Sequence, residues 1–215
     1  MSYLALFAIS AFSIALPGLA ALWRIRQWKH PYFPLAVMLW IGLVNETISY
    51  LLIRNGRANT VNSNLYTLLE YLLFLWLFAR LAAWAPKNLV VASLSGILIW
   101  IIDNLLLHSL ASYNPLTRVF SSIVIVALSI DEVNHVLFSH PAGRRNRARL
   151  LFCCCFFAFF SYQAFISVFD LFPMGVSAEF YKRLYLIMAI FNFIVNLIYT
   201  GLILWTLNRS AYTNC

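Results

Sequence analysis

"LWIGLVNETISYLLI", residues 39–53, places Asn45 and Glu46 in the middle of a run that is otherwise apolar. The stretch "NLYTLLEYLLFLWLF", residues 64–78, does the same with Glu70. Each run is long enough to form most of a membrane-spanning helix, because a bilayer core of about 30 Å needs about 20 apolar residues. Both runs therefore raise the question of what a carboxylate does inside a membrane.

The composition excludes an ordinary soluble domain. Of the 215 residues, 63% are hydrophobic and only 10% are charged, and the mean hydropathy is +0.82. Soluble domains carry roughly 25% charged residues. So little charge cannot cover the surface of a water-soluble protein, and most of this surface is expected to face hydrocarbon.

Seven segments are long and apolar enough to span a bilayer, and no linker between them could form a second domain. The sequence therefore predicts an all-α fold, in which residues 1–215 form a single bundle of seven transmembrane helices. Pro17 is expected to kink the first helix, which neighbouring helices tolerate. The predicted helices cover residues 3–22, 33–53, 65–84, 89–107, 116–138, 150–171 and 183–208.

Most Lys and Arg residues fall on one side of this bundle. The positive-inside rule then places the N-terminus outside and the C-terminus in the cytoplasm. Because no positive charge precedes the first segment, it is expected to be a spanning helix and not a cleaved signal peptide. The cations on the expected cytoplasmic side are Arg24, Arg26, Lys29, Arg80, Lys87, Arg144, Arg145, Arg147, Arg149 and Arg209.

The net charge of +8 does not indicate a nucleic-acid-binding protein. The basic residues lie in short gaps between apolar runs, and no basic face with interleaved aromatic residues is present that could read bases. Membrane lipids are the expected partners, and self-association into a homo-oligomer stays open.

Three acids fall inside predicted helices. At about 1.5 Å of rise per residue, Glu46, Glu70 and Asp103 lie in one layer, about 4–8 Å from the bilayer midplane on the outer side. An intramembrane charge costs at least about 2.5–3.5 kcal/mol, so each acid needs a partner, a proton or a cavity. We predict that the three acids line one outward-opening cavity as catalytic groups. Two carboxylates there do not both ionise easily, which leaves a proton donor beside a charge stabiliser.

Other polar side chains share helix faces with these acids or form stripes on later helices. Turned inward, they would wall a ligand-binding pocket. For the amides of the last helix, the alternative is that they form hydrogen bonds between helices, a common role of polar residues in membrane bundles. The predicted ligand-binding residues are Asn45, Tyr50, Tyr66, Trp100, Asn104, Arg118, Tyr162, Gln163, Tyr185, Asn192 and Asn196.

A second polar cluster, Asp131, Glu132 and His135, ends the fifth predicted helix. Glu132 and His135 have the Glu-x-x-His spacing of di-metal carboxylate bundles, but such bundles need two of these motifs. We therefore expect no metal site and no cofactor. Ion pairing with the basic stretch 144–149 is the expected role of this cluster.

The stretch "YLLIRNGRANTVNSNLYTLLEYLLFLWLF", residues 50–78, resembles a family of small multi-helix membrane proteins of Bacteroidetes-type bacteria. Those proteins pair an N-x-Y-x-x-x-E pattern, here Asn64, Tyr66 and Glu70, with an acid on the preceding helix. The architecture is also similar to that of the seven-helix integral membrane terpene cyclases, which use intramembrane acids to protonate an isoprenoid epoxide or olefin. Where those enzymes carry a late-helix acid, this chain has only amides.

The acids and this resemblance together imply binding or acid-catalysed conversion of a lipophilic small molecule, by an isomerase or cyclase acting on an isoprenoid-like substrate. Two alternatives stay open. The same acids could be proton sites of a small-solute or proton-coupled transporter. The polar residues could also organise the packing of a sensory or assembly subunit.

Overall fold

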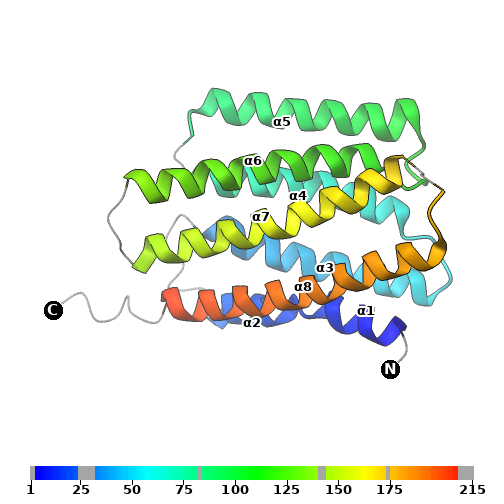
Figure 1. Cartoon of the computed structure of the whole chain (residues 1–215), viewed down its shortest axis with the longest axis horizontal. Coiled ribbons are helices and arrows are strands. Elements are labelled where there is room, and N and C mark those ends of the chain that lie inside the picture. Colours follow the sequence, from blue (N-terminus) through cyan, green and yellow to red (C-terminus); the bar gives the residue numbers. More distant parts are fainter. Residues whose placement is uncertain (1–2, 24–31, 82–83, 140–143, 173–174, 208–215) are drawn as a thin grey trace.

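The computed structural model describes residues 3–23, 32–81, 84–139, 144–172 and 175–207, and within these ranges it is helical with no strands. Helical rods that follow one another run antiparallel along one bundle axis, with α1 and α2 in one rod and α5 and η2 in another (Figure 1). The helices are α1 (Tyr3–Phe12), α2 (Ala15–Trp23), α3 (Phe33–Arg54), α4 (Thr60–Leu81), α5 (Pro86–Ile101), the π-helical turn η2 (Ile102–Leu107), α6 (Pro115–Ser139), α7 (Arg144–Leu171) and α8 (Ala178–Leu207).

Six of the helical rods are long and apolar enough to cross a membrane. They are Leu6–Trp23, Phe33–Arg54, Thr60–Leu81, Pro86–Leu107, Asn146–Leu171 and Ala178–Trp205. The seventh rod, α6, is not among these six; it packs against α4, α5 and most closely α7. A multi-pass helical membrane protein is therefore the architecture of this chain.

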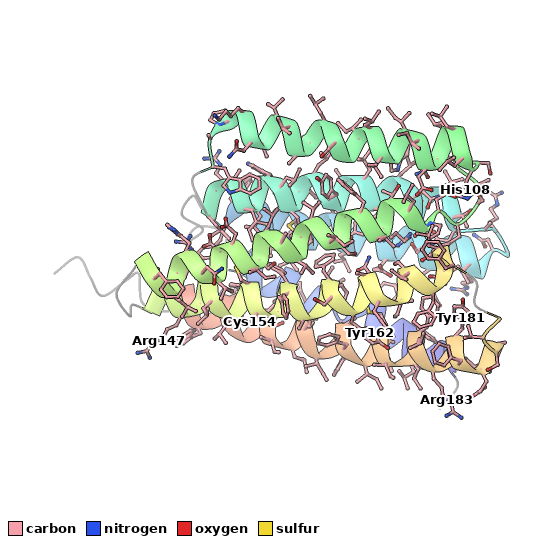
Figure 2. All side chains as sticks on the ribbon, turned by 45° about the horizontal axis from the view of Figure 1, so that its top comes forward. His108, Arg147, Cys154, Tyr162, Tyr181 and Arg183 are labelled. Atoms are coloured by element: carbon pink, nitrogen blue, oxygen red, sulfur yellow. The ribbon has the colours of Figure 1, made fainter. Side chains whose placement is uncertain are left out.

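The two ends of the bundle carry different loops. One end, which we name the Tyr113 end, holds residues 55–59 and 108–114, and the other, the Arg149 end, holds the start of α7. Figure 2 labels His108 at the Tyr113 end and Arg147 at the Arg149 end.

The described residues of the seven predicted segments are mostly helical, but the first segment is broken and the third ends at Leu81, before its predicted end at residue 84; residues 82–83 and 208 of these segments lie outside the described residues. The chain leaves the helix at Ser13 and Ile14, four residues before Pro17. A proline has no N–H to give to the carbonyl four residues earlier, and its ring collides with that carbonyl. The carbonyl of Ser13 instead accepts from Leu16 N at 3.0 Å. The expected kink is therefore a complete break between α1 and α2.

Helix α4 begins at Thr60, five residues before the predicted start at residue 65. Its first turns are polar, which is why the sequence favours a loop there. Their polar groups are nevertheless satisfied within the bundle, because Asn64 Nδ2 donates to the carbonyls of Leu110 at 3.0 Å and Ser112 at 2.7 Å. The helix therefore reaches the Tyr113 end with polar side chains that face its neighbours.

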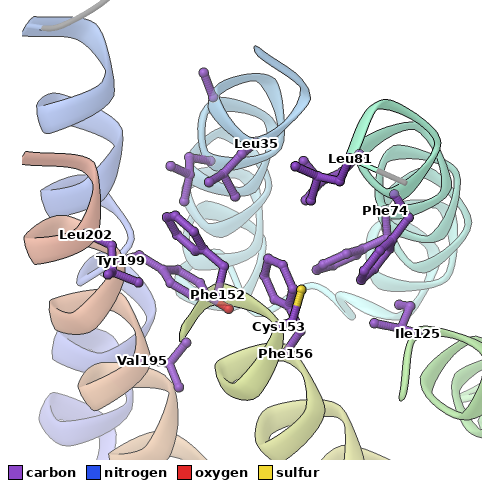
Figure 3. Packing of buried hydrophobic residues seen from close by; sticks show 14 of the residues in the cluster. Leu35, Phe74, Leu81, Ile125, Phe152, Cys153, Phe156, Val195, Tyr199 and Leu202 are labelled. Carbon is purple, nitrogen blue, oxygen red and sulfur yellow. The ribbon is translucent and has the colours of Figure 1, made fainter. Parts of the chain in front are cut away.

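An aromatic cluster fills the bundle between its middle and the Arg149 end (Figure 3). The ring of Phe74 meets Phe156 at 5.0 Å and Phe160 at 4.8 Å, both edge to face. Tyr199 joins from α8, 5.6 Å from Phe156. Such ring pairs stabilise packing beyond the area that they bury. This cluster fixes α4, α7 and α8 relative to one another.

The predicted ion pairing of the second polar cluster is confirmed at Glu132. Its carboxylate, 1% exposed, forms an ion pair with Arg149 Nη2. The same guanidinium donates to the carbonyl of Leu81 at 2.7 Å, at the end of α4. One arginine thus joins α4, α6 and α7 at the Arg149 end.

Candidate functional site: an intramembrane cavity

A cavity of about 410 Å³ lies between α1, α3, α4, α6, α7 and α8. Small-molecule sites usually have volumes of this order. Its walls differ along the bundle axis. Towards the Tyr113 end they carry Ser63, Tyr66 and Arg118, and towards the Arg149 end they carry Phe74 and Phe156.

The cavity is closed at its aromatic end by a second layer of side chains. One turn further along α4, α7 and α8, Phe78, Phe152 and Leu202 are buried and belong to the same apolar cluster, but they do not line the cavity. Figure 3 shows Phe152 and Phe156 stacked along α7 between α8 and α4. The cavity therefore has an apolar floor.

Glu46 and Glu70 both line this cavity, as predicted. They come from adjacent antiparallel helices, and Tyr66 stands between them: its hydroxyl donates to Glu70 Oε1 at 3.3 Å and lies within electrostatic range of Glu46. Tyr66 can approach α3 because residue 42 is glycine, where an added Cβ would lie 3.2 Å from the phenol oxygen. The arrangement places a carboxyl, a phenol and a second carboxyl around one space.

A ladder of amides connects Glu46 with the surface at the Tyr113 end. Asn45 Nδ2 donates to Glu46 Oε1 at 3.3 Å. Asn62 Nδ2 lies 2.8 Å from Asn45 Oδ1 and 3.3 Å from Asn59 Oδ1. Asn62 was missed by the sequence analysis, which placed it in a loop. The three-residue spacing of Asn59 and Asn62, typical of one helix face, was the available signal.

Arg118 is the basic residue among those that line the cavity. Its Nη2 donates to Ser63 Oγ at 2.6 Å, and its guanidinium carbon lies 5.0 Å from the centre of the Tyr113 ring. Its Nε is buried with no hydrogen-bond acceptor, and no carboxylate of the described residues forms an ion pair with it. Arg118 thus holds an unused donor inside the site.

Two tyrosines and an aspartate form a rim at the Tyr113 end. The hydroxyls of Tyr113 and Tyr185 donate to Asp170 Oδ2 at 3.1 and 2.9 Å, which links α7 and α8 to the loop before α6. Desolvation raises the pKa of the Tyr113 phenol, with Arg118 opposing and Asp170 adding to the rise. The phenol therefore stays a neutral donor at physiological pH, and the rim holds together without a charge on Tyr113.

The expectation that Asp103 shares this cavity is wrong. Asp103 is fully buried and does not line it. Its Oδ2 accepts from the backbone N–H and the hydroxyl of Thr117 at 2.7 and 2.8 Å, and its Oδ1 meets His108 Nδ1 at 3.1 Å. A carboxylate is stabilising at a helix N-terminus, where N–H groups lack partners. Asp103 therefore caps α6 from the neighbouring helix.

Four predicted ligand-binding residues also lie outside the cavity lining. Trp100 donates to the carbonyl of Asn64 at 2.9 Å, and Asn104 Oδ1 accepts from Asn114 at 2.8 Å. Tyr162 donates to the carbonyl of Leu184 at 3.0 Å, while the ring of Tyr50 packs on Phe12 at 5.6 Å and is 40% exposed. Their physical role is packing. The predicted residues that do line the cavity are Asn45, Tyr66, Arg118, Gln163, Tyr185, Asn192 and Asn196.

The two amides of α8 have a structural role as well. Asn192 Nδ2 donates to the carbonyl of Ser10 at 3.2 Å, and Asn196 Nδ2 to Ser13 Oγ at 2.8 Å. Both bonds reach the chain at the break between α1 and α2, where backbone groups lose their helical partners. Hydrogen bonding between helices, the alternative for these residues, is thus present.

No family model, curated protein or solved structure matches the chain. Within the described ranges, no group of three His, Cys, Asp or Glu residues is placed to hold a metal ion. The chemistry that the cavity itself offers is a carboxyl beside a phenol, a second carboxyl, and a guanidinium, all facing aromatic walls.

Proposed function

We propose that this chain binds a lipophilic small molecule in the cavity and that Glu70 gives it a proton, as in an isomerase or cyclase. The observation that carries the proposal is the position of Glu70. Its carboxyl faces the cavity with Tyr66 as its hydrogen-bond donor, next to the aromatic side chains of Phe74 and Phe156. An intramembrane acid that faces a cavity is by default a candidate functional group.

The proposed step balances as a proton transfer. Glu70 protonates an olefin or epoxide of the ligand and becomes a carboxylate, whose charge the Tyr66 hydroxyl stabilises. The resulting cation faces aromatic rings, which attract cations through their π faces. Loss of a proton from the neighbouring carbon to the Glu46 carboxylate completes an isomerisation or cyclisation, and proton exchange of both carboxyls with water restores the starting state.

We further propose that the protein lies in a bacterial inner membrane and crosses it seven times, with its N-terminus outside and its C-terminus in the cytoplasm. The seventh crossing is α6, whose 25 residues run beside α7 in the bundle. The support for this orientation comes from the sequence, where ten Lys and Arg residues fall on the predicted cytoplasmic side and five on the other; Arg24, Arg26, Lys29 and Arg209 among the ten lie outside the described residues. Cysteine labelling of Asn59→Cys and Arg147→Cys from opposite faces of the membrane tests it, and labelling of both from one face overturns it.

The proposed chemistry is tested by running it in deuterated water. Protein in lipid nanodiscs is incubated with a panel of isoprenoid olefins, geraniol and farnesol among them, and products are analysed by mass spectrometry. Proton donation by Glu70 leaves deuterium on carbon. Glu70→Gln, which keeps the volume but cannot donate an acidic proton, should lower labelling at least about 100-fold. The matched control is Glu179→Gln, an exposed residue of α8.

Equal labelling by wild type and Glu70→Gln would remove Glu70 as the donor. Loss of the folded protein in Glu70→Gln, seen as a lowered melting temperature, would instead assign Glu70 to the structure.

A proton-coupled carrier is the second candidate, favoured by the amide ladder from Asn59 through Asn62 and Asn45 to Glu46. Such a polar path suits proton entry from water to a buried acid. Alkalinisation of the medium on solute addition to proteoliposomes, lost in Glu46→Gln, would favour the carrier over the enzyme.

A further inference from the structure

Resting on the proposed function, we infer that the ligand is an amphiphile whose anionic head, a carboxylate or phosphate, binds Arg118, with its tail extending past Glu70 to the aromatic floor. Three features of the cavity point to this class: an unused donor, a gradient of polarity and a separation of charges.

The unused donor is the Nε–H of Arg118. It is buried without an acceptor, although the guanidinium is held by Ser63 at 2.6 Å and by the Tyr113 ring at 5.0 Å. A buried donor without a partner is costly. A planar guanidinium held on two sides and free on others matches the oxygens of a carboxylate or phosphate. The guanidinium lines the cavity and has no ion-pair partner among the described residues, so an anionic ligand head there would be its charge partner.

The gradient of polarity gives the ligand its direction. Arg118 and Ser63 lie within the first turns of α6 and α4 at the Tyr113 end, whereas Phe74 lies three turns further along α4. A head at Arg118 therefore leaves the tail among apolar side chains. An outer-leaflet lipid has the same direction, with its head at the membrane surface and its tail towards the midplane.

The separation of charges allows an anion to bind despite the two acids. Ser63 marks the depth of Arg118, and Glu70 comes seven residues later on α4, which is about 10 Å further along the axis. Arg118 Nη2 lies 2.6 Å from Ser63 Oγ, so a head placed beside Ser63 lies beside a cation. Glu70 then faces the tail, where the olefin of the proposed reaction would lie.

The size of the cavity limits the ligand. At about 30 Å³ for each non-hydrogen atom, 410 Å³ holds on the order of 14 such atoms. Dodecanoate has about this many, so amphiphiles with twelve carbons are suitable probes.

The test uses two photoreactive probes, dodecanoic acid and dodecanol that each carry an aliphatic diazirine, on the full chain in nanodiscs. Unlabelled dodecanoate, dodecyl phosphate and dodecanol compete for cross-linking to α4 and α7 peptides. We expect dodecanoate or dodecyl phosphate to compete at concentrations at least about tenfold lower than dodecanol. The better of the two anions identifies the head group. The quantity compared between variants is the ratio of the competing concentration of dodecanol to that of the better anion. Arg118→Gln should bring this ratio to about one. Arg54→Gln, exposed at the same end of the bundle, should leave it unchanged.

Each result decides one idea. Equal competition by acid, phosphate and alcohol in the wild type would overturn the anionic head and leave the lipophilic ligand standing. A ratio unchanged in folded Arg118→Gln would likewise remove Arg118 as the anchor. If neither probe labels cavity peptides, the proposed function fails together with the inference. The wild-type ratio decides the head group even where Arg118→Gln does not fold.

Discussion

The ion pair between Glu132 and Arg149 gives the sharpest test of the fold. The two side chains are 1% and 10% exposed, and Glu132 Oε2 and Arg149 Nε have no hydrogen-bond partner in the described part of the chain. Removing one member of a buried pair leaves an uncompensated charge, which costs about 3–5 kcal/mol. Glu132→Gln, which keeps the volume, should therefore lower the free energy of unfolding by about 3 kcal/mol or more. Arg149→Met should do the same and also lose the bond to Leu81.

The double variant should be clearly more stable than the sum of the two single effects predicts, by at least about 1 kcal/mol, because neither charge is then left alone. Unfolding by SDS titration from detergent micelles measures all four proteins. The chain offers its own control in Glu179 and Arg183, a pair on α8 whose side chains are 58% and 75% exposed. Removing that pair should change stability by only about 0.3–0.5 kcal/mol. Single variants that cost less than about 1 kcal/mol and add without coupling would refute the assigned role of the pair.

Two further predictions concern packing and capping. An added Cβ at Gly96 would lie 2.0 Å from the Tyr71 ring, so Gly96→Ala should lower the free energy of unfolding by about 1–3 kcal/mol, whereas Gly201→Ala, with no atom within 4 Å, should be neutral or stabilising. The same SDS titration checks both, and equal effects would contradict the close contact of α4 and α5. Asp103→Ala should cost about 1–3 kcal/mol through the lost cap at Thr117 and leave deuterium labelling per folded molecule unchanged. A loss of deuterium labelling per folded molecule in Asp103→Ala would show that Asp103 takes part in the proposed reaction.

Apolar run length predicted the positions of the helices well, because a bilayer needs a fixed number of apolar residues. Three details escaped it. The break before Pro17 is accompanied by bonds from α8 that one segment cannot reveal, because Asn192 donates to the Ser10 carbonyl and Asn196 to the Ser13 hydroxyl. The start of α4 at Thr60 depends on carbonyls of the loop at Leu110 and Ser112 that accept from Asn64. The π-helical turn η2 has no sequence signature in its local residues. Each is decided by tertiary contacts that a single segment does not contain.

The prediction that the three acids share one cavity shows what the sequence alone does not reveal about the site. Rise per residue gives the depth of a side chain along a helix, and Glu46, Glu70 and Asp103 were predicted at similar depths. Depth says nothing about which neighbour a helix face meets. Helix α5 lies at the edge of the bundle against α4 and α6, away from α1 and α8 (Figure 1). Asp103, in the η2 turn that continues α5, therefore meets Thr117 at the start of α6 and not the cavity.

The partners of each buried acid separate a structural carboxylate from a reactive one. Asp103 accepts short hydrogen bonds from a backbone N–H and a hydroxyl and meets a histidine, so its oxygens are satisfied in a fully buried position. Glu70 has one longer bond, 3.3 Å from Tyr66, and faces an open volume. Asp103 is thus held by α6 and His108 and does not line the cavity. Glu70 faces the cavity instead, and this contrast is why we propose Glu70, and not Asp103, as the proton donor.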